Sequence, residues 1–243
     1  MKKYELTENT KIVDDITLYQ IRALIDIPQM YIKAGDLGGY IQSEHNLSHE
    51  GTCWVFGKAM VYGQARVSDN AKISGEAIVN GWGQVFGDAD VYGKAHVFEN
   101  AQVWGNACVS GLARVYGSAR VYGSAKIFDT GSVSDEACVY SDAKVYGGAW
   151  VYGNAKVFDN TRVSNKSVLS GGNWVINPIS ILGSKHHVCH CDTDKIRVGC
   201  ITRTFDEWLE QFEEIGRKNQ YTDIQINEYK IYIDAIININ KSR

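Results

Sequence analysis

Residues 144–160, KVYGGAWVYGNAKVFDN, contain nearly the same six-residue unit three times. Val145, Val151 and Val157 are spaced six apart, an aromatic residue follows each of them, and an alanine stands four places after the first two. A β-branched residue favours extended backbone, and glycine, aspartate or asparagine two places later favours a turn. Each hexapeptide therefore predicts one short strand and one corner.

The spacing of six continues along most of the chain. Stepping by six from Val55 to Ile181 gives 22 positions, of which 21 are Val or Ile. Alternation along a strand places the neighbours of an inward valine outside, and an alanine fits a crowded inner corner. Self-similarity at a fixed period is the signature of a solenoid, in which each unit buries its apolar face by stacking on the next. We therefore expect a β-solenoid over most of the chain.

Composition limits the functions that this solenoid could have. The chain has 44% hydrophobic residues, 24 glycines, two prolines and a formal net charge of -3. A small negative net charge does not indicate binding to a nucleic-acid polymer. The sequence has no apolar run of about 18 residues, so we expect no membrane-spanning segment. The start, MKKYELTENTKIVDD, lacks the apolar run of a signal peptide, and six cysteines are scattered along the chain. We expect a cytoplasmic protein of a bacterial cell.

The two ends of the repeat predict separate units. Residues 1–39 are expected to form a short β-rich cap over the open edge of the first coil, before a β-helix at residues 40–184. Ile41 and Leu47 already follow the spacing of six, and residues 49–50 look like a two-residue insertion before the regular coils.

Residues 185–243 predict a C-terminal α+β cap or oligomerisation module. HHVCHCDTDKIRVGCITR, residues 186–203, predicts a hairpin. Its cysteines and histidines suggest a zinc site. The C-x-C spacing along a strand, however, lacks the C-x-x-C turn that places two sulfurs on one ion. We expect a packed face and no metal there. The residues expected on this face are His187, Cys189 and Cys191 opposite Ile196, Val198 and Cys200.

Two helices are expected to follow the hairpin. Thr204 with Glu207, and Thr222 with Gln225, have the spacing of capping boxes. Each box precedes residues at helical spacing that predict one apolar stripe. These are Phe205, Trp208, Leu209, Phe212 and Ile215 in the first helix, and Tyr229, Tyr232, Ile233 and Ile236 in the second.

The tandem V-Y-G-x-A hexads resemble those of left-handed parallel β-helices. In that family three hexads form one triangular coil, so 22 hexads would give about seven coils and a prism of roughly 34 Å. The flanks, YIKAGDLGGYIQSEHNLSHEGTCWV at residues 31–55 and GCITRTFDEWLEQF at residues 199–212, resemble uncharacterised hexapeptide-repeat proteins of bacteria and their phages. The resemblance implies the fold and a phage or prophage setting, and implies no shared activity.

An acyltransferase is one alternative that the resemblance raises. Acyltransferases with this fold have a catalytic histidine near a subunit boundary and usually a long loop that leaves the coil. The only histidine in the regular coils is His96, which precedes Val97 and is expected outside, in solvent, and no loop interrupts residues 55–181. Carbonic anhydrases with this fold need several converging histidines. We therefore expect no catalysis.

The outer surface offers a candidate binding site. An aromatic residue follows the inward position at 13 of the 22 sites, and a coil of three hexads would stack five of them on one face with basic residues and no acid beside them. Such a face could pack against identical subunits, grip a protein partner, stack a planar anionic ligand, or merely stabilise the coils. The candidate residues are Phe86, Trp104, Tyr122, Tyr140 and Phe158 with Arg120 and Lys156.

These expectations combine into one hypothesis about function. We expect a homo-oligomer, with a trimer favoured, that acts without catalysis or cofactor. The phage-like resemblance suggests that it binds or sequesters a host molecule, either a protein or a small anionic, nucleotide-like signal. The alternatives are the acyltransferase and a purely structural assembly protein.

Overall fold

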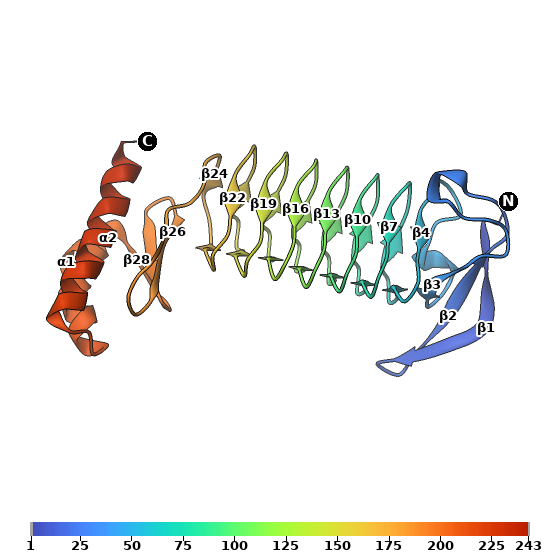
Figure 1. The fold of residues 1–243 in the computed structure, drawn as a ribbon, viewed down its shortest axis with the longest axis horizontal. Helices are drawn as coiled ribbons and strands as arrows, with labels where there is room; N and C mark the ends of the chain where they lie inside the picture. Colours follow the sequence, from blue (N-terminus) through green and yellow to red (C-terminus); the bar gives the residue numbers. More distant parts are fainter. Residues whose placement is uncertain (1, 243) are drawn as a thin grey trace.

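The hexapeptides fold into very short strands separated by corners, as the spacing predicts (Figure 1). The computed structural model describes residues 2–242. The solenoid strands are β4 (Trp54–Val55), β5 (Met60–Val61), β6 (Arg66–Val67), β7 (Lys72–Ile73), β8 (Ile78–Val79), β9 (Gln84–Val85), β10 (Asp90–Val91), β11 (His96–Val97), β12 (Gln102–Val103), β13 (Cys108–Val109), β14 (Arg114–Val115), β15 (Arg120–Val121), β16 (Lys126–Ile127), β17 (Ser132–Val133), β18 (Cys138–Val139), β19 (Lys144–Val145), β20 (Trp150–Val151), β21 (Lys156–Val157), β22 (Arg162–Val163), β23 (Val168–Leu169) and β24 (Asn173–Trp174).

The strands form three parallel sheets, which are the three sides of the solenoid. We call them the ladder face (β6, β9, β12, β15, β18, β21 and β24), the lysine face (β4, β7, β10, β13, β16, β19 and β22) and the histidine face (β5, β8, β11, β14, β17, β20 and β23). Val103 pairs with Val85 on one side and Val121 on the other, which confirms that three hexads make one coil. The solenoid makes about eight turns, one more than predicted.

The predicted interior is confirmed from Val55 to Leu169. The inward valines and the alanines at the inner corners are fully buried, as Val103 and Ala101 illustrate. The residue two places after each inward valine turns the corner with a left-handed backbone, for example Gly105 at φ +70° and Asp135 at φ +56°. Asp135 compensates for its strain, because its Oδ2 accepts a hydrogen bond from the Gly153 amide of the next coil at 2.9 Å.

A β-rich cap covers the N-terminal end, as expected. β1 (Tyr4–Val13) and β2 (Ile16–Ala23) form an antiparallel hairpin, β2 pairs with β3 (Leu37–Ile41), and β3 pairs in parallel with β5. Short 3-10 helices lie at Pro28–Met30 (η1) and Glu44–Asn46 (η2).

The first coil is longer than the others. Ile41 pairs with Val61 and Leu47 bridges to Val67, so this coil exceeds three hexads by two residues, which confirms the predicted insertion. Ile41 and Leu47 are fully buried. This early coil also explains the additional turn of the solenoid.

The spacing of six ends earlier than predicted. Trp174 takes the place predicted for Val175, because it pairs with Val157 and points inward. Val175 is 48% exposed, so the predicted inward positions of Val175 and Ile181 are wrong. The last coil turns at a glycine pair, and a Cβ on Gly171 would lie 2.7 Å from the Asp192 carboxylate of the C-terminal sheet. The incoming sheet therefore tightens the corner, and a large indole fills the end of the core.

A four-stranded antiparallel sheet closes the C-terminal end. Its strands are β25 (Ser180–Leu182), β26 (His187–Asp192), β27 (Lys195–Val198) and β28 (Ile201–Thr204). The predicted hairpin is confirmed, but its predicted facing is wrong, because Val188 pairs with Val198 and Cys189 pairs with Arg197. β26 is buried on both sides: Val188 packs toward the helices, while the Cys189 thiol lies 3.9 Å from the Val168 carbonyl oxygen of the last coil.

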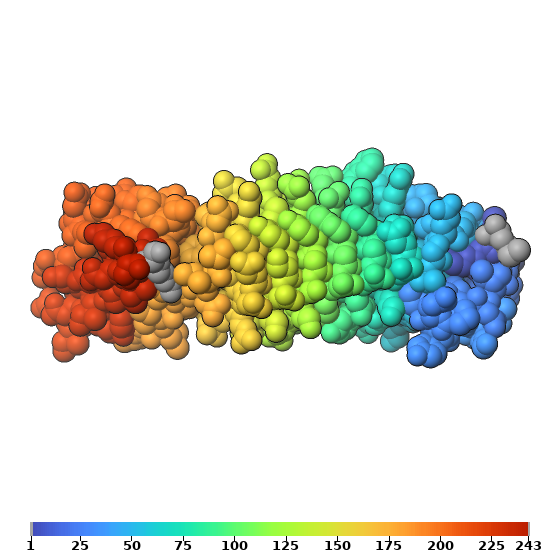
Figure 2. Space-filling view, turned by 90° about the horizontal axis from the view of Figure 1, so that it is seen from above, coloured from blue at the N-terminus to red at the C-terminus, as the bar shows by residue number. Residues whose placement is uncertain are grey.

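Two helices cover the outer side of this sheet (Figure 1), at the opposite end of the elongated molecule from the N-terminal cap (Figure 2). They are α1 (Phe205–Lys218) and α2 (Asp223–Lys241), and both predicted capping boxes are formed. The predicted stripes are buried or half-buried except Leu209, which is 44% exposed. Neither helix is long and apolar enough to span a membrane.

Candidate functional site

The five predicted aromatic residues form one continuous stack on the ladder face. Successive ring centroids from Phe86 through Trp104, Tyr122 and Tyr140 to Phe158 lie 5.5, 4.5, 4.9 and 4.9 Å apart. The rings are within 5° of parallel because the coils hold them in register. We call these five rings the aromatic ladder.

Basic side chains accompany the aromatic ladder. Arg120 and Lys156 precede the inward valines of β15 and β21, so they stand on the same outer surface as the rings and are exposed. Within residues 2–242 neither of them forms an ion pair. No acidic residue occupies an equivalent strand position on this face. The face therefore combines apolar ring edges with two exposed cations that form no ion pair among the described residues.

Stacking limits what the rings can bind. Each inner ring is covered on both sides by its neighbours, so it presents only its edge to the outside. The edge of an aromatic ring carries partial positive charge, so these edges favour contact with an anionic or polar group. They offer no free ring surface on which another aromatic ring could stack. Only the two terminal rings, Phe86 and Phe158, keep one side that no other ring of the ladder covers.

The free side of Phe86 opens into a groove. In the two preceding coils the position of the ring is taken by Ser68 and Ser48, whose amides donate to the Val85 and Val67 carbonyl oxygens at 3.1 and 2.9 Å. Both serines therefore lie in line with the ladder. The groove has a volume of about 630 Å³, and we call it the serine groove. Its lining includes His45, Ser48, His49, Arg66, Ser68, Gln84 and Phe86.

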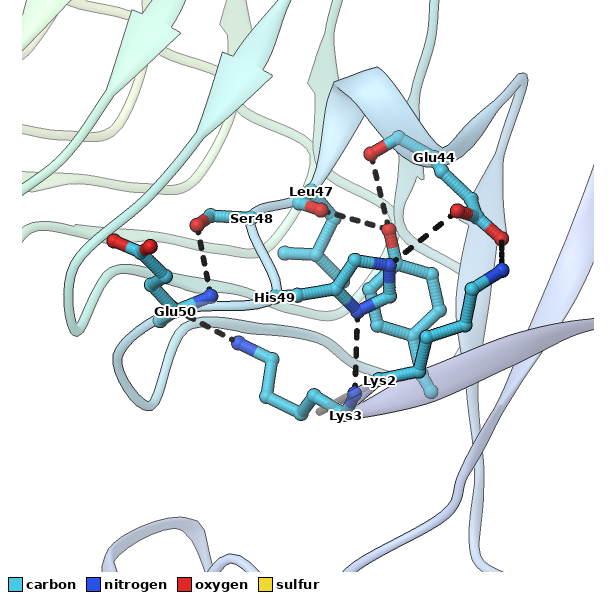
Figure 3. A network of polar contacts seen from close by, with 8 residues as sticks. Lys2, Lys3, Glu44, Leu47, Ser48, His49 and Glu50 are labelled. Carbon is cyan, nitrogen blue, oxygen red and sulfur yellow. Dashed lines mark hydrogen bonds and ion pairs between the residues drawn. The ribbon is translucent and has the colours of Figure 1, made fainter.

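One wall of the serine groove is held by the N-terminal residues (Figure 3). Lys2 Nζ lies 2.6 Å from Glu44 Oε1, and this contact lowers the pKa of the Glu44 carboxyl. His49 Nδ1 accepts a hydrogen bond from the Lys3 amide at 3.2 Å, so its Nε2 carries the hydrogen and points to Glu44 Oε2, 3.5 Å away. The Tyr4 ring stacks on His49 with centroids 4.3 Å apart. The wall is thus fixed before any ligand arrives.

Charge in the serine groove is unequally compensated. Glu44, its acidic lining residue, is paired with the Lys2 ammonium, and the neutral His49 ring points its Nε2 hydrogen at the same carboxylate. Arg66 on β6 is exposed and forms no ion pair or side-chain hydrogen bond with the rest of the described chain. The guanidinium of Arg66 is therefore free to meet an anion beside the uncovered side of Phe86.

Three of the buried cysteines, Cys53, Cys189 and Cys191, are poor candidates for a nucleophile. Burial raises the pKa of the thiols of Cys53, Cys189 and Cys191, the last to about 12. Such thiols stay protonated and inert near neutral pH. Residues 2–242 contain no group of three or more histidine, cysteine, aspartate or glutamate side chains placed to hold a metal ion.

His96 lies outside the coil, as predicted, but it is not solvated as predicted. Its ring packs 4.3 Å from the Phe98 ring, and its Nε2 lies 2.9 Å from Asn80 Oδ1, so the side chain is half-buried. Burial, and then the nearby Arg114, lower the pKa of His96. Burial and Arg114 thus favour the neutral imidazole, and its Nε2 meets the Asn80 amide oxygen where a general base would have an orienting carboxylate.

Sequence reasoning missed the serine groove. The ladder was visible from the spacing of three hexads, whereas the groove depends on how residues 44–50 fold back over the first coil. One signal was available, because Ser68 interrupts the aromatic series one coil before Phe86. A scan against protein-family models and a search of curated protein sequences found no match to this chain.

Proposed function

We propose that this chain is a non-catalytic binding protein that holds a host molecule against the ladder face. The observation that carries the proposal is the combination of five stacked rings with Arg120 and Lys156, which form no ion pair within residues 2–242. A surface of ring edges and free cations favours a partner that carries negative charge. A small nucleotide-like anion or an acidic surface of a host protein has this chemistry.

We propose that the protein acts as a homo-oligomer, with a trimer as the favoured state, in the bacterial cytoplasm. A threefold trimer needs a heterologous contact, in which one side of each solenoid packs against a different side of the next subunit. The three sides share the same coil spacing, so two different sides can lie in register along the solenoid. In such an assembly a ligand would be held between the ladder face and an adjacent subunit. The setting, a phage or prophage gene product, rests on the resemblance of the flanking sequences.

An acyltransferase is the weaker alternative. It would need His96 as a base, and this imidazole is packed on Phe98 and bonded to an amide. Strands β4 to β23 follow one another at intervals of six without an inserted loop that could build a pocket. Catalysis also needs a partner that orients the base, and the partner that the structure gives to His96 within residues 2–242 is the Asn80 amide, not a carboxylate.

The test is native mass spectrometry of the oligomer purified from bacterial cells, followed by denaturation and identification of what is released. The proposal predicts a molecule that is retained by the wild type and released unchanged, and no turnover of acyl-coenzyme A donors. The double variant Arg120→Gln, Lys156→Gln should lose the molecule. Its matched control, Lys126→Gln, Arg162→Gln, alters cations one hexad further along on the lysine face and should retain it. Equal retention by both double variants would contradict the proposal.

A further inference from the structure

The aromatic ladder ends at Phe86, although the solenoid continues for two more coils whose equivalent positions hold serine and no aromatic ring. Ser68 stands one coil before Phe86, and Ser48 stands one coil before Ser68. Adjacent parallel strands are about 4.8 Å apart, so the two serines leave about 10 Å of the ladder line without an aromatic side chain. Within the ladder the same spacing accommodates one ring per coil.

We propose that the serine groove binds a small ligand that has a planar aromatic ring and an anionic group, such as a nucleoside monophosphate. The ring stacks on the uncovered side of Phe86, above Ser68, and continues the ladder by one step. The anionic group binds the Arg66 guanidinium. This inference rests on the proposed function and names the ligand class and its position.

The geometry of the ladder favours stacking at this position. The Phe86 ring stacks on the Trp104 ring with an angle of 3° between their planes, so the orientation of the Phe86 ring is fixed. The uncovered side of Phe86 is therefore ready to receive a second ring in parallel. A base that stacks on a fixed aromatic ring loses less entropy than one that must order a mobile side chain. The groove volume of about 630 Å³ lies within the range of small-molecule sites.

The polar groups of the groove favour an anion. Arg66 lies on the strand that ends beside Ser68, and its guanidinium has no partner within residues 2–242. Glu44 does not compete for Arg66, because Lys2 and His49 engage its carboxylate. A phosphate group can accept two hydrogen bonds from one arginine fork, which a neutral ligand cannot match.

Isothermal titration calorimetry with AMP, GMP and UMP tests this inference on the full chain. Adenosine, which lacks the anion, and inorganic phosphate, which lacks the ring, should each bind at least about 10-fold more weakly than AMP. The variant Ser68→Tyr fills the free position with the chain's own ring and should abolish detectable binding. Arg66→Gln should weaken binding about 10-fold or more.

The matched control is Ser74→Tyr. Ser74 lies one hexad after Ser68, at the equivalent position of the lysine face, between Phe56 and Tyr92 of the adjacent coils, and it is half-buried like Ser68. It should bind AMP as the wild type does, and circular dichroism should show both tyrosine variants folded. Binding by Ser74→Tyr but not by Ser68→Tyr supports the inference.

Other outcomes separate this inference from the proposed function. If none of the three nucleotides binds the wild type, or if Ser68→Tyr binds as tightly as Ser74→Tyr, the inference is wrong. If binding is lost in Arg120→Gln, Lys156→Gln but kept in Ser68→Tyr, the ligand lies along the ladder edges. In that case the inference fails and the proposed function stands. An oligomer that retains no molecule in native mass spectrometry contradicts the proposed function itself.

Discussion

Two valines that the six-residue spacing treats as equivalent should differ strongly in their contribution to stability. Val163 is fully buried in the solenoid core, whereas Val175, two hexads later, is 48% exposed because the last coil is one residue short. Replacing valine by alanine removes two methyl groups, worth about 0.8 kcal/mol each when buried. Val163→Ala should therefore lose about 1.6 kcal/mol of transfer free energy plus about 1 kcal/mol for the cavity.

Val175→Ala should cost less than about 1 kcal/mol, because about half of the side chain is already in water and no closed cavity forms. Urea unfolding followed by circular dichroism measures both free energies of unfolding, with unchanged m-values as the control for a similar unfolding transition. Trp174→Ala should be the most destabilising of the three at about 3 kcal/mol or more. If Val175→Ala and Val163→Ala destabilise equally, the shift of register at the last coil is wrong.

Three further perturbations probe other parts of the fold. Burial raises the pKa of the Cys191 thiol from 9.0 to about 12, so between these pH values only the unfolded chain releases the thiol proton. The free energy of unfolding should therefore fall as pH rises above 9, by at most about 1.4 kcal/mol per pH unit. Urea titrations at pH 8 and pH 10 measure this fall, and Cys191→Ala should remove it. The Cβ of Gly57→Ala meets no atom within 4 Å, so this variant should lose only about 1 kcal/mol of stability, because alanine disfavours the left-handed backbone there. The Cβ of Gly105→Ala lies 3.1 Å from the Gly123 backbone, so this variant should lower the thermal unfolding midpoint further. Equal midpoints for the two variants would contradict this reasoning. Thr204→Ala removes the cap of α1 and should cost about 1 kcal/mol in urea unfolding, and no loss would mean that the capping box does not stabilise the helix.

The solenoid was predictable because its determinants are local and repeated. Each hexapeptide carries its own inward β-branched residue, its own small corner residue and its own left-handed turn, so one coil predicts the next. Prediction failed where a neighbouring unit decides the conformation. The shift at Trp174 depends on the sheet that packs against Gly171, and nothing within residues 169–175 indicates that contact.

The C-terminal hairpin shows a different limit. Strand β26 is buried on both sides, with Val188 against the helices and Cys189 against the last coil, so alternation of polar and apolar residues gives no signal of its orientation. The position of the rings on the ladder face followed from spacing alone. The serine groove did not, because it combines that spacing with the path of an irregular loop.

A structure at atomic resolution of the oligomer as purified from bacterial cells would test the central claim most directly. The account predicts that a bound molecule or an adjacent subunit covers the ladder face from Phe86 to Phe158, with negative charge beside Arg66, Arg120 or Lys156. A ladder face that remains bare, with the bound molecule instead in a pocket around His96, would contradict it.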